Sequence, residues 1–299
     1  MIKLYCITTI FLLITCNVQA QNNYDPAIKK LLAPDAKLER ISDQFIFTEG
    51  PAVDKNGDVY FTDQPNDKIW KYVMETKKLI LFMDGCGRSN GLFFDSKGNL
   101  LACADEKNEL WSIDMKGNKT IILDGAEGRK FNGPNDVWEA PNGDIYFTDP
   151  YYHRPYWNRP EIQPAKEYVY LLKKGSKKAI SVDDALMQPN GIIGSKDGKW
   201  LYVADIDGDK TDRYKISKDG SLKEKSVFAP MGSDGMIIDK KGNLYITGRG
   251  VTVYDINGKH IGNIPVPSEW VGNVTIAGKN KDVLFITASE SIYVLRMQD

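Results

Sequence analysis

Six acid or amide side chains occupy one equivalent position in a repeating pattern of this chain. They lie ten or eleven residues before the first apolar residue of six similar segments, and they are Glu49, Asn90, Asn135, Asn190, Asp234 and Asn273. Oxygen donors of this kind suit one hard divalent cation, Ca²⁺ before Mg²⁺, with Mn²⁺ and Zn²⁺ as alternatives. Glu49 and Asp234 would supply the two charges that neutralise such an ion. The chain has only two histidines, which argues against a histidine-based zinc site.

The same residue types also have an ordinary structural role. Asn, Asp and Gly are common in the turn before a strand, so Asn90 and Asn273 could serve only to shape that turn. Asn90 is also a candidate substrate contact. Turn chemistry does not call for a glutamate, and Glu49 is therefore the strongest indication that the set binds an ion.

The six segments themselves are short apolar strands, each preceded by a turn. Examples are residues 57–63, 143–149 and 242–247, and the copies recur about every 40 to 45 residues. This period is typical of a β-propeller, in which the first strand of each blade lines a central channel. We therefore predict an all-β, six-bladed propeller over residues 37–299, with the six polar side chains at one mouth of its channel.

The last blade lacks its outer strand. Only three strands, at 273–277, 283–288 and 291–296, remain after Asn273. The segment 38–46 has a loosely strand-like apolar pattern and is the candidate for the fourth strand. Its pairing with the last strand would close the ring and remove an open edge.

Three aspartates and a tyrosine-rich insertion are expected near the same mouth. Asp63, Asp149 and Asp205 end the strands that return to it, where they could hold substrate, act as acid and base, or only cap the strand ends. The insertion that follows Asp149 runs from Pro150 to Lys166 and includes Tyr151 and Tyr152. It could form a wall or lid over a small ligand, or pack on the surface of a blade.

The N-terminus is typical of an exported protein. Residues 1–20 have the pattern of a signal peptide, with an apolar core at 8–15 and a cleavage-type ending at 18–20. The apolar core is too short to span a membrane. Lipid attachment at Cys16 is the less favoured alternative to periplasmic or secreted protein. Residues 21–36 would form an N-terminal extension.

The remaining bulk properties set further limits. A net charge of −1 gives no electrostatic reason to expect nucleic acid as a partner. Cys86 and Cys103 are compatible with a disulfide in an exported protein, but their spacing leaves the pairing open. The oligomeric state is open as well.

Five segments resemble the signatures of the SMP-30/gluconolactonase/regucalcin-like family. They are Glu-Gly-Pro at 49–51, Phe-Asn-Gly-Pro-Asn-Asp-Val at 131–137, Tyr-Phe-Thr-Asp-Pro at 146–150, Gln-Pro-Asn-Gly at 188–191 and Ser-Asp-Gly-Met at 233–236. The resemblance covers essentially the whole mature chain and is much less specific to substrate than to family.

The resemblance implies a divalent metal, usually Ca²⁺, in the channel of a six-bladed propeller. The residues that match the metal ligands of the family are Glu49, Asn135, Asn190 and Asp234, and Asp234 also matches a general base or nucleophile. The family often has a substrate-binding arginine before the Asn-Asp segment. Lys130 takes its place here, next to Arg129, and this departure affects the identity of the substrate.

Two classes of function follow from these observations. The first is a metal-dependent lactonase that opens a sugar lactone, in which the metal polarises the carbonyl and Asp234 assists removal of a proton from water. Other esters or phosphotriesters are alternative substrates of the same site. The second is a non-catalytic propeller that binds a sugar or a protein around a structural ion. A ring of oxygen ligands beside a tyrosine-rich loop favours the enzyme.

Overall fold

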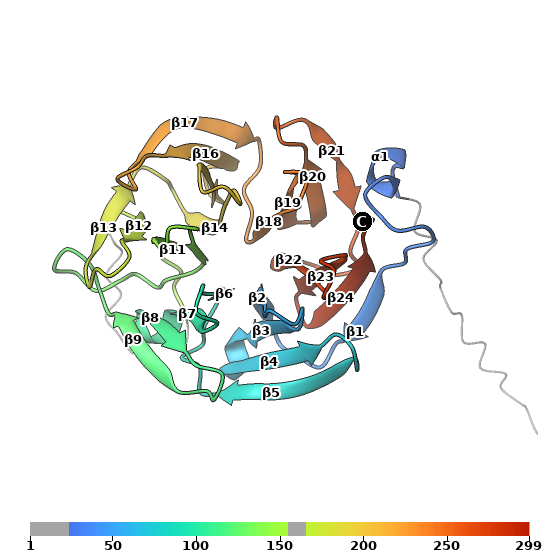
Figure 1. Cartoon of the computed structure of the whole chain (residues 1–299), viewed down its shortest axis with the longest axis horizontal. Coiled ribbons are helices and arrows are strands. Elements are labelled where there is room, and N and C mark those ends of the chain that lie inside the picture. The colour runs from blue at the N-terminus through green and yellow to red at the C-terminus, as the bar shows by residue number, and fades with distance from the viewer. Residues whose placement is uncertain (1–23, 155–165, 299) are drawn as a thin grey trace, which may run out of the picture.

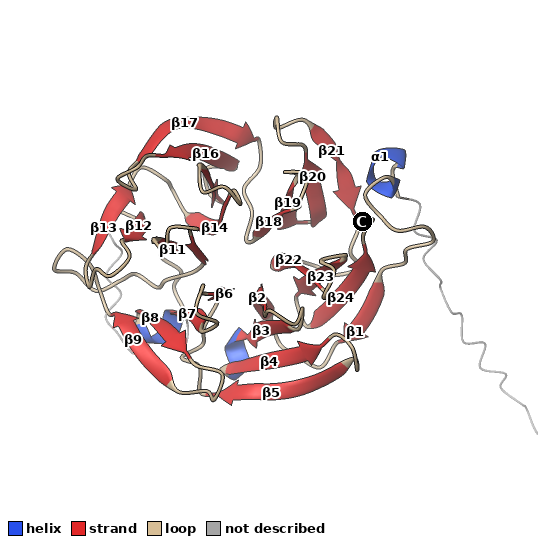
Figure 2. Ribbon diagram, in the orientation of Figure 1, coloured by secondary structure: helices blue, strands red, loops and turns tan. Residues whose placement is uncertain are grey.

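The computed structural model describes residues 24–154 and 166–298, and six antiparallel sheets of four strands surround a central channel (Figure 1). Strands and turns make up nearly all of these residues (Figure 2). The six-bladed all-β propeller predicted from the repeat is confirmed. The signal peptide predicted over 1–20, with Cys16, and the part of the insertion from 155 to 165 lie outside the described residues.

Each blade begins with the strand nearest the channel. Blade 1 is β2 (Thr48–Val53), β3 (Val59–Asp63), β4 (Lys68–Val73) and β5 (Lys78–Asp84). Blade 2 is β6 (Leu92–Phe94), β7 (Leu100–Ala104), β8 (Glu109–Ile113) and β9 (Lys119–Leu123). Blade 3 is β10 (Val137–Glu139), β11 (Ile145–Asp149), β12 (Tyr168–Leu172) and β13 (Ala179–Asp183). Short 3₁₀ turns, η1 (Gln64–Asn66) and η2 (Asp105–Lys107), follow β3 and β7.

The second half repeats the arrangement. Blade 4 is β14 (Pro189–Gly194), β15 (Trp200–Asp205), β16 (Lys210–Ile216) and β17 (Leu222–Ala229). Blade 5 is β18 (Met236–Ile238), β19 (Leu244–Gly248), β20 (Gly250–Tyr254) and β21 (His260–Ile264). Blade 6 is β22 (Asn273–Ala277), β23 (Val283–Ala288), β24 (Ser291–Arg296) and β1 (Glu39–Ser42).

Blade 6 is built from both ends of the chain, as the sequence predicts. Strand β1 pairs antiparallel with β24, with Glu39 opposite Val294 and Arg40 opposite Tyr293. Upstream, helix α1 (Pro26–Lys29) is capped by the side chain of Asp25, and its Ile28 is fully buried against blades 5 and 6. The described part of the N-terminal extension is therefore packed on the propeller.

The turns between the first two strands of blades 1, 2 and 5 have a common construction. The carboxylate of Asp54 accepts hydrogen bonds from the backbone N–H of Asn56 (2.8 Å) and Asp58 (3.0 Å), and Gly57 has a φ of 89°. Glycine adopts this left-handed conformation without steric cost. Asp239 makes the equivalent bonds in blade 5. These turns set the register that places each inner strand.

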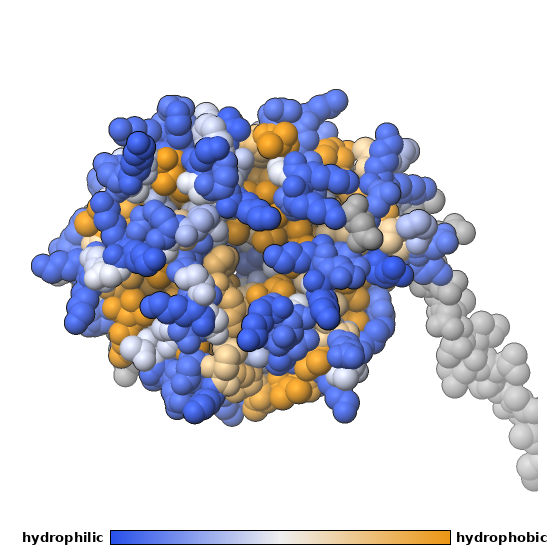
Figure 3. Space-filling view, viewed as in Figure 1, coloured by the Kyte–Doolittle hydropathy of each residue, from blue (hydrophilic) through white to orange (hydrophobic). Residues whose placement is uncertain are grey.

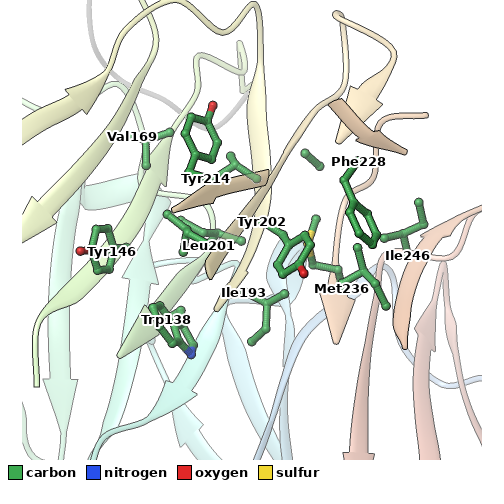
Figure 4. Packing of buried hydrophobic residues seen from close by; sticks show 14 of the residues in the cluster. Trp138, Tyr146, Val169, Ile193, Leu201, Tyr202, Tyr214, Phe228, Met236 and Ile246 are labelled. Carbon is green, nitrogen blue, oxygen red and sulfur yellow. The ribbon is translucent and has the colours of Figure 1, made fainter. Parts of the chain in front are cut away.

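Aromatic and aliphatic side chains fill the space between neighbouring blades (Figure 4). Between blades 3 and 4, the ring of Trp138 stacks on Tyr146 at a centroid distance of 5.9 Å. Trp138 also lies against Gly194, where an added Cβ would stand 2.1 Å from the indole. On the face shown in Figure 3, hydrophilic side chains cover the blade tips and apolar residues surround a central opening.

Candidate metal and catalytic site

In four of the six blades a glycine follows the polar ring position and lets the neighbouring inner strands approach one another closely. A Cβ on Gly50 would lie 2.1 Å from the carbonyl oxygen of Asn90, and one on Gly91 would lie 2.6 Å from that of Asn135. The N–H of Gly91 donates a 2.7 Å hydrogen bond to the latter oxygen. Only glycine permits backbones to come this close. The glycines next to the ring thus allow the ring residues of neighbouring blades to lie close together.

Two threonines on second strands hydrogen-bond the ring backbone of the next blade. The hydroxyl of Thr62 donates to the carbonyl of Asn90 at 3.1 Å, and that of Thr148 donates to the carbonyl of Asn190 at 2.7 Å. These bonds cross from blade 1 to blade 2 and from blade 3 to blade 4. The backbones of Asn90 and Asn190 are therefore held without use of their own side chains.

Two carboxylates of the ring repel each other inside the protein. Burial raises the pKa of Glu49 well above its usual value, and the nearby charge of Asp234 raises it further. Burial also raises the pKa of Asp234, although hydrogen bonds from Trp270 and Asn190 partly oppose this effect. A cation between these two groups would reverse the effect, because an opposite charge favours the ionised form.

A third buried acid, Asp136, lies near Glu49 and Asp234 and was not predicted as a site residue. Burial raises its pKa to about 7. Its carboxylate accepts hydrogen bonds from the N–H of Val137 (2.9 Å) and Ile192 (3.3 Å), which joins blade 3 to blade 4. Together with Asn273, it also lines a cavity of about 220 Å³ among the inner strands. Asp136 therefore forms part of the floor beneath the ring.

Asp234 is the most elaborately supported member of the ring. The amide nitrogen of Asn190 donates a 2.7 Å hydrogen bond to one of its oxygens, and the indole N–H of Trp270 donates to the other. The same Asn190 nitrogen lies 2.7 Å from the hydroxyl of Tyr152. Since the nitrogen is used in this way, the amide oxygen of Asn190 is the atom left to ligate a cation.

The residues predicted to bind the ion fit an oxygen-coordinated cation. Glu49 and Asn190 are buried beside Asp234, and Asn135 is only 4% exposed. The carboxamide oxygen of the buried Asn135 is a donor of the kind that a hard cation prefers. No group of three or more His, Cys, Asp or Glu within residues 24–154 and 166–298 could hold a metal, so a cation here would depend on the asparagine oxygens.

The first residues of the insertion line the same mouth. The guanidinium of Arg154 lies 4.7 Å from the ring centroid of Tyr152 and donates to the carboxylate of Asp105 at 3.1 Å. Gln64 donates to the same carboxylate at 3.2 Å. Burial raises the pKa of Tyr152, so this hydroxyl stays protonated near neutral pH. Tyr151 is half-buried next to it.

A model of the SMP-30/Gluconolactonase/LRE-like region matches residues 47–290. The chain belongs to this family. A gluconolactonase of Zymomonas mobilis is 24% identical, over 91% of this chain and 85% of its own length. The diisopropyl-fluorophosphatase of Loligo vulgaris is 26% identical, over 87% of this chain and 91% of its own. The solved structure of a gluconolactonase from Xanthomonas campestris has a TM-score of 0.84 and 28% identity, covering 92% of this chain and 93% of that one.

In this SMP-30 family member, the aspartates at the strand ends have structural partners. Asp149 accepts hydrogen bonds from the N–H of Asn132 and of Gly133, both at 2.9 Å. Asp205 accepts from Gln188 at 2.8 Å and from Met187. Both carboxylates thus hold the loops that lead into the inner strands, which is the capping role left open by the sequence. A substrate contact for either residue stays a prediction.

The structure also gives the surroundings of Lys130 and of the two cysteines. Lys130 is exposed, and its ammonium donates to Asp124 at 2.9 Å instead of contacting the ring in the described residues. Its role in substrate binding stays a prediction. Cys86 and Cys103 are both buried free thiols, which answers the open question of a disulfide in this structure.

Trp270, Arg154 and Asp136 are the site residues that the sequence-based prediction omitted. Trp270 stands three residues before Asn273, and Asp136 directly follows Asn135, so both could have been found from the repeat. Arg154 lies in an insertion without counterpart in the other blades, and the repeat gives no signal for it.

Proposed function

We propose that this protein is a metal-dependent hydrolase that opens the ring of a sugar lactone. The coarser assignment, a lactonase-type hydrolase, rests on family membership and on relatives named as gluconolactonases that match most of the chain. The metal, the sugar character of the substrate and the mechanism below are parts of the proposal. No helix of the described residues is long and apolar enough to cross a membrane.

The observation that carries the proposal is the pair of buried carboxylates, Glu49 and Asp234, set among asparagine oxygens. We propose that Glu49, Asn135, Asn190 and Asp234 hold one divalent cation, with Ca²⁺ as the first candidate. When bound, such a cation would polarise the lactone carbonyl and stabilise the negative charge that develops on its oxygen.

Asp234 would act as the base in ring opening. One carboxylate oxygen accepts a proton from the attacking water as the oxygen of that water bonds to the carbonyl carbon. The ring C–O bond then breaks, and the proton passes to the departing ring oxygen, which yields the hydroxy acid. The bonds from Asn190 and Trp270 keep the carboxylate oriented during these steps.

A second candidate is hydrolysis of a phosphotriester or another ester at the same site. The relative from Loligo vulgaris, named a diisopropyl-fluorophosphatase, favours this alternative. A propeller that only binds a sugar or protein would use the same ring for a structural ion. Fold cannot separate these functions, because one fold supports several.

An assay separates the three outcomes. Purified protein is treated with chelator and then supplied with Ca²⁺, Mg²⁺, Mn²⁺ or Zn²⁺, and each sample is tested with glucono-1,5-lactone, an aryl ester and diisopropyl fluorophosphate. We expect metal-dependent opening of the lactone. Faster turnover of the phosphorus substrate would favour the second candidate. Metal binding without turnover of any substrate would favour the binding propeller.

A further inference from the structure

At one position of the repeat, beside the mouth of the channel that carries the ring, the polarity and size of the side chain differ from blade to blade. It lies three residues before each ring residue, in the loop that leads into the inner strand. The backbone N–H groups of Ile46, Asn132 and Met187 all bond the aspartate that ends the second strand of their own blade, at 3.1, 2.9 and 3.1 Å. These shared bonds show that the position is structurally equivalent in blades 1, 3 and 4.

Four consecutive blades carry large apolar side chains at this position. They are Met187 in blade 4, Met231 in blade 5, Trp270 in blade 6 and Ile46 in blade 1, which we call the apolar arc. Blades 2 and 3 carry Gly87 and Asn132 instead. Because blade 6 adjoins blade 1, the four positions follow one another without interruption around the mouth.

Three of the four side chains of the arc are exposed, whereas Met231 is half-buried and packs against the hydrophobic core. Met187 is 63%, Ile46 58% and Trp270 36% exposed. The other large apolar side chains with similar exposure are scattered on outer strands or hairpin turns, for example Ile121 on β9 and Ile256 in the turn before β21. Scattered exposed side chains are ordinary, whereas apolar groups gathered at a pocket indicate a ligand contact.

Trp270 shows that this position reaches the catalytic group. Its indole N–H donates to Asp234 while part of the ring stays open to solvent. A ligand whose reactive group is held at Asp234 would therefore also meet the apolar surface of Trp270.

The opposite side of the mouth is polar. Gln64 and Arg154 converge there on the carboxylate of Asp105, and Arg88 pairs with Glu106 at 3.4 Å. These residues belong to the loops of blades 1 to 3. The mouth thus offers charged and hydrogen-bonding groups on one side and the apolar arc on the other.

We propose that the apolar arc binds an apolar substituent of the lactone, so that the preferred substrate is a lactone bearing an alkyl or aryl group and not a fully hydroxylated one. The inference rests on the lactone-opening reaction proposed above, which it keeps together with the site residues, but it replaces the sugar lactone by a lactone with an apolar substituent as the preferred substrate. A fully hydroxylated lactone has hydroxyls on every side, and those facing the arc would lose hydrogen bonds to water without replacement.

The test compares two δ-lactones, glucono-1,5-lactone and a lactone with a butyl substituent. Each is assayed with the wild type, Ile46→Thr, Met187→Gln and the matched control Ile121→Thr, which makes the same change at a residue 51% exposed on β9. We expect the wild type to have the higher kcat/KM for the butyl lactone. Each arc variant should lower that value about fourfold or more, the effect of about one buried methylene, mainly through KM. The control variant should keep the kcat/KM of the wild type for both lactones within about twofold. The arc variants should keep the wild-type kcat/KM for glucono-1,5-lactone within the same limit.

The outcomes separate this inference from the proposed function. Rapid turnover of glucono-1,5-lactone with slower turnover of the butyl lactone would overturn the inference and leave the lactonase function standing. Equal effects of the arc variants on both substrates would also overturn it. Turnover of neither lactone would contradict the lactonase function and, with it, the inference.

Discussion

The amide nitrogen of Asn190 and the carboxylate of Asp234 meet across the boundary between blades 4 and 5 at 2.7 Å. Asn190 is the second residue of β14 and Asp234 lies two residues before β18, and both were predicted as ion ligands from their place in the repeat. Their contact means that the carboxylate proposed as the base is oriented by a neighbouring proposed ligand. Changes at the two residues should therefore not be additive in their effects on activity.

Asp234→Asn and Glu49→Gln should differ in their response to metal. Both variants remove one charge from the ring, but only the first removes the proposed base. Asp234→Asn should lose roughly a hundredfold or more in kcat, and saturating metal should restore only part of it. Glu49→Gln should chiefly weaken metal binding and recover much of its rate in excess metal. Ca²⁺ titration followed by fluorescence, with lactonase assays over a metal series, measures both effects. Full metal rescue of Asp234→Asn would show that the residue is only a ligand.

Tyr152→Phe tests the contribution of the insertion to the site. The change removes the hydroxyl that Asn190 contacts but keeps the aromatic ring under Arg154. Loss of one such bond should lower kcat/KM roughly two- to tenfold without lowering the melting temperature. Tyr168→Phe is the matched control, because its hydroxyl accepts from Arg129 at 2.6 Å on the surface of blade 3. Equal kinetic effects of the two changes would argue against a role for Tyr152.

The metal-free protein should become less stable as the pH rises. Burial raises the pKa of Asp136 to about 7, whereas the unfolded chain has an ordinary aspartate. An acid with a raised pKa stabilises the fold below its unfolded pKa, and this contribution is lost as the pH rises through about 7. Between pH 5 and pH 8 the loss is at most about 3 kcal/mol for this group, because only the interval from pH 5 to about 7 contributes. Urea unfolding of chelator-treated protein at pH 5 and pH 8 measures it.

Asp136→Asn provides the comparison for that pH dependence. The variant should be less pH-dependent than the wild type between pH 5 and 8, because the titrating group is gone. An unchanged difference between the two pH values would assign the effect to other groups, such as Glu49, whose pKa is also raised by burial.

Gly194→Ala should destabilise the contact between blades 3 and 4. Its new Cβ would lie 2.1 Å from the indole of Trp138, and such overpacking typically costs about 1–3 kcal/mol. Trp138→Leu in the same chain should recover part of this loss by making room. Thermal or urea unfolding of the two single variants and the double variant gives the coupling. Strictly additive losses would mean that the clash is relieved in another way.

Export is the remaining prediction, and it concerns the N-terminus. The mass of protein recovered from the periplasm or medium should correspond to cleavage after Ala20. A lipid-modified chain that begins at Cys16 would contradict this expectation, and Cys16→Ser should then release the protein from the membrane fraction. Unprocessed full-length protein in the cytoplasm would exclude both forms of export.

The repeat was sufficient to predict most of the fold because each blade is encoded locally. The turn residues around Gly57 and Gly242 determine the hairpins, and the strands predicted at 273–277, 283–288 and 291–296 coincide with β22, β23 and β24. Even the pairing of the N-terminal strand followed, since a propeller with an unpaired edge is unfavourable.

The side chains in loops were harder to predict, because their partners come from other blades. The orientation of Asp149 and Asp205 towards loop amides depends on how the loops fold back, which the strand pattern does not encode. Trp270 contacts Asp234 only because blades 5 and 6 are neighbours. Lys130 was placed near the substrate by resemblance, yet its ammonium pairs with Asp124 at the surface.

The pairing of β1 with β24 has a consequence for the order of folding. Strands within blades 1 to 5 pair with partners close in the sequence, whereas Glu39 in β1 pairs with Val294 near the end of the chain. Contacts of such long sequence separation form slowly, because the chain entropy of closing the loop is lost before the contact is gained. During synthesis, this pairing cannot form until nearly the whole chain has emerged. Nascent or truncated chains would then display two unpaired strand edges, which makes ring closure the step at which aggregation competes with folding.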